Sequence, residues 1–127
     1  MGYFYSLRGW LEFGSDDFDR VIGQIKSLQQ RYLEDDQASH YMSGWCWPSK
    51  PFNWTVFIFY GGDVKLPGLD LFETVLKAVC DLGCKVEGDF HAQGEDGAEN
   101  LVYRIVNDAW TVEPGAAMFE SDFEEQE

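Results

Sequence analysis

Hydrophobic and polar positions change their spacing several times along the chain, and each change predicts a new element. Residues 3–13 place apolar side chains at nearly every second position, which predicts a β-strand. A serine and two aspartates then favour a helix start, and hydrophobic residues recur at helical spacing over residues 16–33. Residues 34–36 are expected to form a polar loop, and residues 41–47 are typical of a second strand that a proline ends.

The next two elements are a strand and a helix. Residues 54–60 are apolar at nearly every position, which predicts a central strand that is covered on at least part of each side and stopped by two glycines. Asp70 and Glu73 have the spacing of a capping box, so we expect a second helix to begin there. An apolar stripe follows, and Gly83 stands where a left-handed helix end is expected.

Three shorter strands complete the pattern. Residues 86–91 alternate, residues 101–106 follow a polar turn, and Asn107 and Asp108 supply a tight turn before residues 109–113. The order β-α-β-β-α-β with an additional C-terminal β-hairpin predicts an α+β fold. We expect a two-layer sandwich of ferredoxin-like kind, with both helices on one face of the sheet.

A single α+β domain is expected over residues 1–113, because the length suits one domain and no change of composition divides the chain earlier. From residue 113 onward there are six acids and no base. Residues 114–127 are therefore expected to form an acidic, mobile C-terminal tail, in which only Met118, Phe119 and Phe123 offer anchors.

Composition indicates a folded protein with an acidic exterior. The 127 residues carry a formal net charge of −14, and 17% of them are aromatic. Acidic chains that are poor in aromatic residues tend to be disordered, whereas this chain has the side chains for a core. Nine Lys and Arg against 23 Asp and Glu oppose the basic field that binds phosphates, so we expect a basic protein partner and no direct nucleic-acid binding.

The three cysteines are an odd number and lie in apolar segments, which favours reduced thiols and a cytoplasmic location. Cys46, Cys80 and Cys84 could join His40 as zinc ligands, but their spacing differs from that of compact zinc sites. No cationic neighbourhood activates any of them as a nucleophile. No stretch approaches the roughly 20 apolar residues of a membrane span. We therefore expect neither a metal nor a cofactor.

Three clusters of acids and two tryptophans are the candidate partner-binding residues. Helix capping, a solvated loop and a hairpin turn also account for the three clusters, and none has the spacing of a calcium loop. Paired catalytic carboxylates need a cleft, which the sequence does not reveal. The tryptophans are included because Trp supplies binding hot spots in polar interfaces. The candidates are Asp16, Asp17, Asp19, Glu34, Asp35, Asp36, Trp45, Trp47, Glu95, Asp96 and Glu99.

Three segments carry a resemblance to a known class. They are Gly-Trp-Cys-Trp-Pro at 44–48, Asn-Trp-Thr at 53–55 and Phe-Tyr-Gly-Gly-Asp at 59–63. Together with the acid excess, they resemble the small acidic immunity proteins that bacteria encode beside toxin domains, including those of contact-dependent inhibition and related polymorphic toxin systems. The resemblance implies a protein without enzymatic activity that neutralises a cognate basic toxin, such as a nuclease domain, by stoichiometric occlusion.

Two alternatives to an immunity protein stay open. A nucleic-acid mimic that inhibits a DNA-binding or defence protein would use the same acidic field. A small enzyme or ligand-binding domain would instead use the sheet face opposite the helices.

Overall fold

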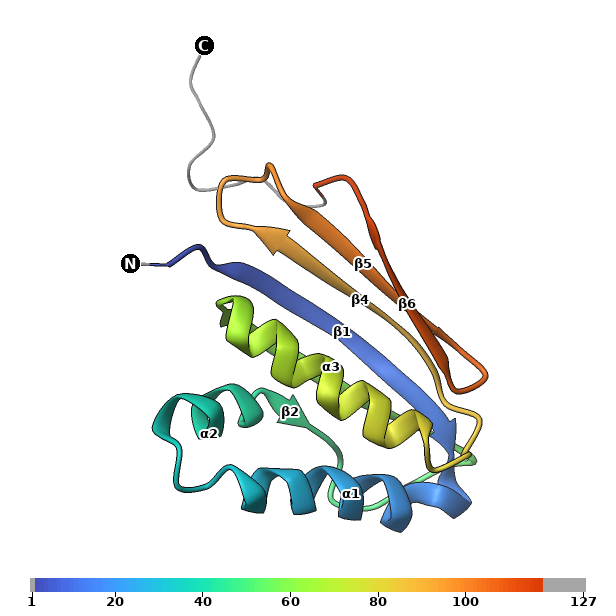
Figure 1. Cartoon of the computed structure of the whole chain (residues 1–127). Coiled ribbons are helices and arrows are strands. Elements are labelled where there is room, and N and C mark those ends of the chain that lie inside the picture. Colours follow the sequence, from blue (N-terminus) through green and yellow to red (C-terminus); the bar gives the residue numbers. More distant parts are fainter. Residues whose placement is uncertain (1, 118–127) are drawn as a thin grey trace.

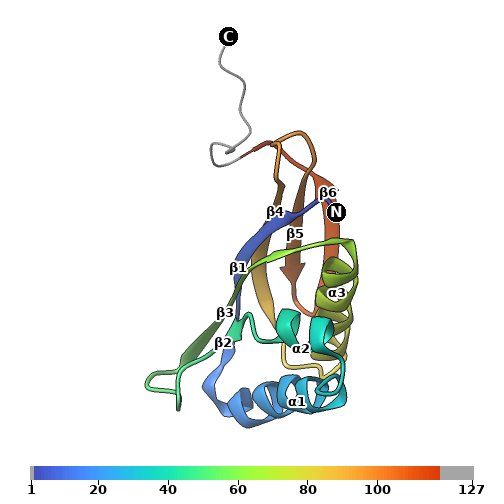
Figure 2. The ribbon, with the colours of Figure 1, turned by 90° about the vertical axis from the view of Figure 1, so that its left-hand side faces the viewer.

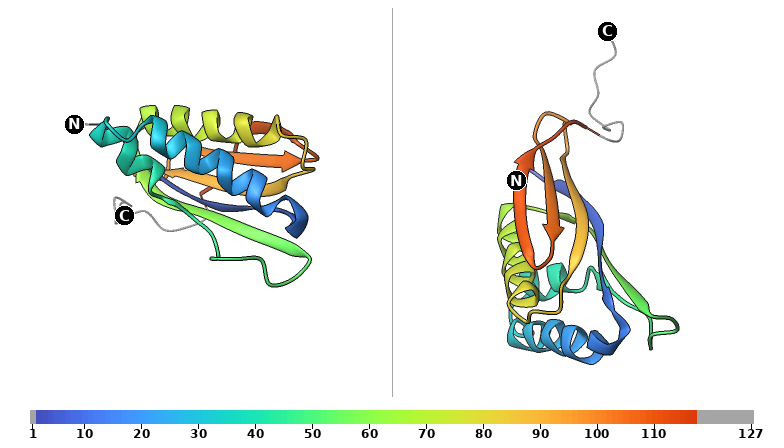
Figure 3. Two further views of the ribbon diagram at one scale, coloured as in Figure 1. Left: turned by 90° about the horizontal axis from the view of Figure 1, so that it is seen from below. Right: turned by 90° about the vertical axis from the view of Figure 1, so that its right-hand side faces the viewer.

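The computed structural model describes residues 2–117, which form a six-stranded antiparallel sheet with three α-helices on one of its faces (Figure 1). Figures 2 and 3 show the two layers from the side. The strands lie in the order β2-β3-β1-β4-β5-β6. In chain order the elements are β1 (Tyr5–Gly14), the 3-10 turn η1 (Ser15–Asp17), α1 (Phe18–Arg31), α2 (Asp36–Met42), β2 (Trp45–Cys46), β3 (Thr55–Val64), α3 (Leu66–Cys80), β4 (Glu87–Gly94), β5 (Asn100–Val106) and β6 (Ala109–Pro114).

The expected α+β class is confirmed, but the ferredoxin-like order is not established. The second strand contains only the two residues of β2, and the sequence pattern did not predict the helix α2. Among the described residues, none of the helices has the length and apolar character needed to cross a membrane.

β1 is the centre of the sheet and pairs with both β3 and β4. Its alternation is confirmed, since Leu7 and Leu11 are buried while Trp10 points to the opposite face. At Gly9 the neighbouring strand approaches closely: a Cβ atom there would lie 2.1 Å from the carbonyl oxygen of Asp89. Glycine is the residue that permits this approach.

The two long helices bury the apolar stripes that the sequence predicts. In α1 the buried residues are Phe18, Val21, Ile22, Ile25 and Leu28. α3 begins at Leu66, four residues before the expected start, because Pro67 fits the first turn of a helix.

The predicted capping box is therefore wrong, because both of its residues lie inside α3. Glu73 instead accepts a hydrogen bond of 2.8 Å from the Tyr103 hydroxyl. The left-handed conformation expected at Gly83 is confirmed, with φ of 75°.

The strand predicted over residues 41–47 is wrong in its first half. Asp35 caps α2 by accepting a hydrogen bond of 3.0 Å from the Ala38 amide, so the predicted polar loop at 34–36 runs into a helix. Tyr41 and Met42 are buried at the end of that helix, and a buried pair of this kind has the same apolar sequence pattern in a helix as in a strand.

β3 is longer than expected and passes through Gly61 and Gly62. These glycines pair with Arg8 and Leu7 of β1, and the amide of Gly61 also donates to the Gly44 carbonyl at 3.2 Å. Pairing on both sides holds the strand together where the local sequence favours a break.

The C-terminal strands β4, β5 and β6 form a meander, which contains the predicted C-terminal hairpin. Asn107 and Asp108 have φ of 50° and 69°, as a tight hairpin turn between β5 and β6 requires. The Asp108 carboxylate also accepts hydrogen bonds from the amides of Lys85 and Val86, at 2.9 and 2.8 Å, which fixes the entry into β4.

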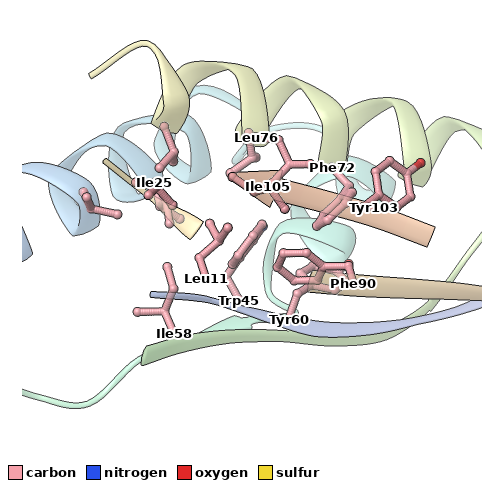
Figure 4. Close-up of a cluster of buried hydrophobic side chains, with 14 of the residues drawn as sticks. Leu11, Ile25, Trp45, Ile58, Tyr60, Phe72, Leu76, Phe90, Tyr103 and Ile105 are labelled. Carbon is pink, nitrogen blue, oxygen red and sulfur yellow. The ribbon is translucent and has the colours of Figure 1, made fainter. Parts of the chain in front are cut away.

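An aromatic cluster between α3 and the sheet forms the middle of the core (Figure 4). Trp45 stacks on Phe72 with ring centroids 5.7 Å apart, and Phe72 meets Phe90 and Tyr103 edge-on at 4.8 and 5.1 Å. Large aromatic rings thus fill the space beneath the helices. The other face of the sheet has no covering element among the described residues.

Candidate binding surface

The open face of the sheet, opposite the helices, carries side chains from all six strands. Strand pairing sets them in register, so that one row crosses the whole sheet. This row consists of Cys46, Phe59, Trp10, Asp89, Arg104 and Thr111, in spatial order. Its β2 end is apolar and its β5 end is charged, so the open face has two chemically different regions.

The first region is an exposed aromatic surface that we call the hairpin patch. It comprises Trp10, Phe52, Trp54, Phe57 and Phe59. Phe52 and Trp54 are 85% and 78% exposed and lie in the β2–β3 connection, which projects away from the helices (Figure 2). Phe52, Phe57 and Phe59 line one groove of about 390 Å³. Exposed aromatic residues gathered on one side of a molecule mark interaction sites in soluble proteins.

Acidic side chains border the hairpin patch. Glu12 on β1 is paired with Phe57, and Glu87 on β4 follows in the same row. The Ser15 amide donates a hydrogen bond of 2.9 Å to the Trp54 carbonyl, which brings the chain next to Asp16 close to the backbone of Trp54. The patch thus combines apolar anchors with a negative rim.

The first acidic cluster therefore adjoins the patch, although its members differ in availability. Asp16 and Asp19 are exposed. Asp17 is less exposed and forms an ion pair of 3.5 Å with Arg20.

The second cluster lies at the far end of α1. Glu34 and Asp36 are exposed, and Asp35 is engaged as the α2 cap. A 14-residue helix spans about 21 Å, so this cluster and the first one lie well apart.

The third cluster fastens the start of β1 to the β4–β5 turn. The Glu95 carboxylate accepts a hydrogen bond of 2.8 Å from the Phe4 amide, and the Glu99 carboxylate accepts one of 2.5 Å from the Tyr5 hydroxyl. The Asp96 carboxylate accepts a hydrogen bond from the Tyr3 hydroxyl. The hydrogen bond from Tyr3 lowers the pKa of Asp96, and burial together with the Glu99 bond raises the pKa of Tyr5 to about 12. These acids have structural partners, and the three clusters do not form one acidic face.

The two candidate tryptophans have different environments. Trp45 is 4% exposed in the core, so it does not contact a partner in this fold. Trp47 is half-buried and lines the groove of the hairpin patch. Phe57 and Phe59 were missed as surface residues because the apolar run 54–60 indicated cover on both sides, while Phe52 lies in a loop that gives no periodic signal.

The second region of the open face is a groove of about 470 Å³ that we call the arginine groove. Its open-face side chains are Arg8, Trp10, Asp89, His91, Val102 and Arg104. Arg104 lies 3.8 Å from the Asp89 carboxylate. Two arginines and a histidine gathered here contrast with the acidic balance of the whole chain.

Two of the three cysteines are buried. All three are free, and burial raises the pKa of Cys80 to about 11 and also raises that of Cys84. These two thiols are therefore protonated and unreactive at neutral pH. Within residues 2–117, no three His, Cys, Asp or Glu side chains are grouped as metal ligands.

The tail proposed from the sequence starts in contact with the body. Gly115 and Ala116 form hydrogen bonds with residues of β5 and β4, whereas the anchors proposed at Met118, Phe119 and Phe123 lie outside the described residues.

Comparison with protein-family models, with curated proteins and with solved structures finds no match to this chain.

Proposed function

We propose that this protein binds a basic protein partner through the hairpin patch and inhibits it stoichiometrically, as an immunity protein does to its cognate toxin domain. The observation that carries the proposal is the exposed aromatic patch with its acidic rim, in a chain of net charge −14. Aromatic side chains supply most of the binding energy in such interfaces, and the acids accelerate association with a positively charged surface.

A toxin domain that cleaves nucleic acid fits this partner chemistry, because its active site must attract phosphates. An acidic surface that covers this active site keeps the nucleic-acid substrate out, and its charge also raises the rate at which the inhibitor associates with the toxin domain. The proposal needs no catalytic group, and it places the protein in the cytoplasm of the cell that it protects.

We also propose that the fold is of ferredoxin-like kind. The antiparallel order β2-β3-β1-β4, with α1 and α3 on one face, supports it. The β5–β6 hairpin extends this arrangement at the β4 edge.

The test begins with affinity purification of the partner from the native host, followed by binding kinetics. We expect Trp54→Ala to raise the dissociation rate and weaken binding roughly 30-fold, as a hot spot of about 2 kcal/mol implies. Leu33→Ala, a change at an exposed apolar residue just after the C-terminal end of α1, is the matched control and should leave both rates unchanged.

Charge reversal tests the acidic rim separately. Asp16→Lys with Glu87→Lys should slow association, and raised salt should slow it in the unmodified protein as well. Glu34→Lys with Asp36→Lys makes the same charge change away from the patch and should have a smaller effect. If the partner is acidic, if the two charge pairs act equally, or if the protein alone turns over a substrate, the proposal is wrong.

A further inference from the structure

The described chain ends on the open face of the sheet. After β6, the Gly115 amide donates to the Asn100 carbonyl at 2.9 Å, and a Cβ on Gly115 would lie 2.5 Å from the Cγ2 atom of Val102. The Ala116 carbonyl oxygen is 3.1 Å from the Nε2 atom of His91. The backbone therefore leaves the edge of the sheet and crosses toward β4, above the side chains of the arginine groove.

The groove that it enters suits an acidic and partly aromatic peptide. Arg8 and Arg104 are exposed there, and Trp10 and Val102 provide apolar surface beside them. Asp89 and His91 lie on the strand between the two arginines, with the Asp89 carboxylate 3.8 Å from Arg104. Arginine binds carboxylates in a bidentate geometry and stacks on aromatic rings. A segment with both kinds of side chain would match the groove.

The remaining ten residues have this composition. Residues 118–127 contain five acids and no base, together with Phe119 and Phe123. Fully extended, ten residues span about 33 Å. The step from Arg104 on β5 to Arg8 on β1 crosses two strand spacings, about 10 Å, so the segment is long enough to cover the groove.

We propose that residues 118–127 dock within the same molecule onto the arginine groove, with carboxylates against Arg8 and Arg104 and a phenylalanine beside Trp10. Because the segment is tethered at Ala117, its local concentration is on the order of millimolar, so even weak contacts keep it bound. The protein's own tail then covers the basic half of the open face together with Trp10, and it leaves the other four residues of the hairpin patch free. This inference does not depend on the proposed function.

The location is tested by comparing backbone amide chemical shifts of the full chain and of a chain that ends at Ala117. We expect differences at open-face positions of β1, β4 and β5, centred on Arg8, His91 and Arg104, and none on α1. In high salt the full chain should approach the spectrum of the shortened chain, because the ion pairs are screened. Differences confined to residues next to Ala117, or centred on another surface, would overturn the proposal.

Charge variants test the contacts. Arg8→Glu with Arg104→Glu should abolish the shift differences, whereas Lys26→Glu with Lys77→Glu, the same charge change at exposed helix positions, should keep them. If the arginine variant does not fold, Glu120→Gln, Asp122→Asn and Glu124→Gln in the segment itself should reduce the differences without affecting the body.

The source of the docked segment is tested by dilution. Intramolecular docking predicts shift differences that do not change with protein concentration, whereas docking onto a second copy predicts their loss on dilution and would overturn the proposal. A synthetic peptide of residues 118–127 added to the shortened chain should restore the same shifts at high peptide concentration. If the peptide perturbs other residues instead, the groove is not its site.

Discussion

Trp45 and Trp54 are separated by only eight residues in the sequence, but one lies in the core and the other is exposed. Trp45 is enclosed by the rings of Tyr60, Phe72 and Phe90, and Trp54 is 78% exposed. We expect Trp45→Ala to lower the free energy of unfolding by about 3–5 kcal/mol, because it leaves a large cavity. Trp54→Ala should change it by no more than about 0.5 kcal/mol. Urea denaturation measures both, and equal losses would contradict the assignment of Trp54 to the surface.

The tyrosines predict a loss of stability in alkali. Burial raises the pKa of Tyr60 to about 12, and burial with the Glu99 hydrogen bond does the same for Tyr5. The unfolded chain loses these protons near pH 10, so stability is complete below pH 10 and falls as the pH rises toward 12. Tyrosinate absorbance should show a fraction of the six tyrosines titrating only on unfolding. Titration of all six near pH 10 in the folded protein would contradict this.

At the scale of elements, two glycines allow the central strands to approach each other. A Cβ on Gly9 would lie 2.1 Å from the Asp89 carbonyl oxygen, and one on Gly88 would lie 2.2 Å from that of Trp10. We expect Gly9→Ala to cost about 2–3 kcal/mol or more, since backbone atoms must move. Gly61→Ala is the control, because nothing lies within 4 Å of its added Cβ. Thermal unfolding compares them, and similar melting temperatures would show that the sheet adjusts freely.

Element order could be read from the sequence wherever a local signal and the tertiary environment agree. The stripe of α1, the positive φ of Gly83 and the β5–β6 turn are of this kind. The sequence-based predictions are wrong where a contact with a distant part of the chain determines the secondary structure. Gly61 and Gly62 stay in β3 because β1 pairs with them, and Tyr41 is helical although the apolar residues of 41–47 are typical of a strand.

The candidate surface was harder to predict than the fold. Acidic clusters are visible in the sequence, but their hydrogen-bond partners are not. Glu95, Asp96 and Glu99 are engaged by residues 3–5, more than ninety positions away. The exposure of Phe57 and Phe59 depends on which sheet face the helices cover, and a continuous apolar run carries no information on that choice.

At the scale of the whole molecule, the negative charge is spread over the surface and is poorly compensated. Ion pairs such as Arg20–Asp17 and Lys77–Asp81 are solvent-exposed, so each contributes little to stability. A net charge of −14 on a compact chain instead gives mutual repulsion that unfolding relieves. The folded state is thus destabilised most at low ionic strength.

We therefore expect sodium chloride to raise the melting temperature. Going from about 0.01 to about 0.5 M shortens the screening length from about 30 Å to about 4 Å, which removes most repulsion between exposed acids. A gain of about 1 kcal/mol would raise the melting temperature by roughly 3–6 °C for a domain of this size. Chloride is preferred to sulfate, because sulfate strengthens apolar burial in any protein.

Two variants test whether the acids cause this effect. Glu34→Gln with Asp36→Asn should reduce the rise of the melting temperature with salt. The chain that ends at Ala117 should show the same sign, since most of the acids precede residue 118. A melting temperature that falls with added chloride would mean that attractive charge contacts outweigh the repulsion, so that the acidic exterior stabilises this fold.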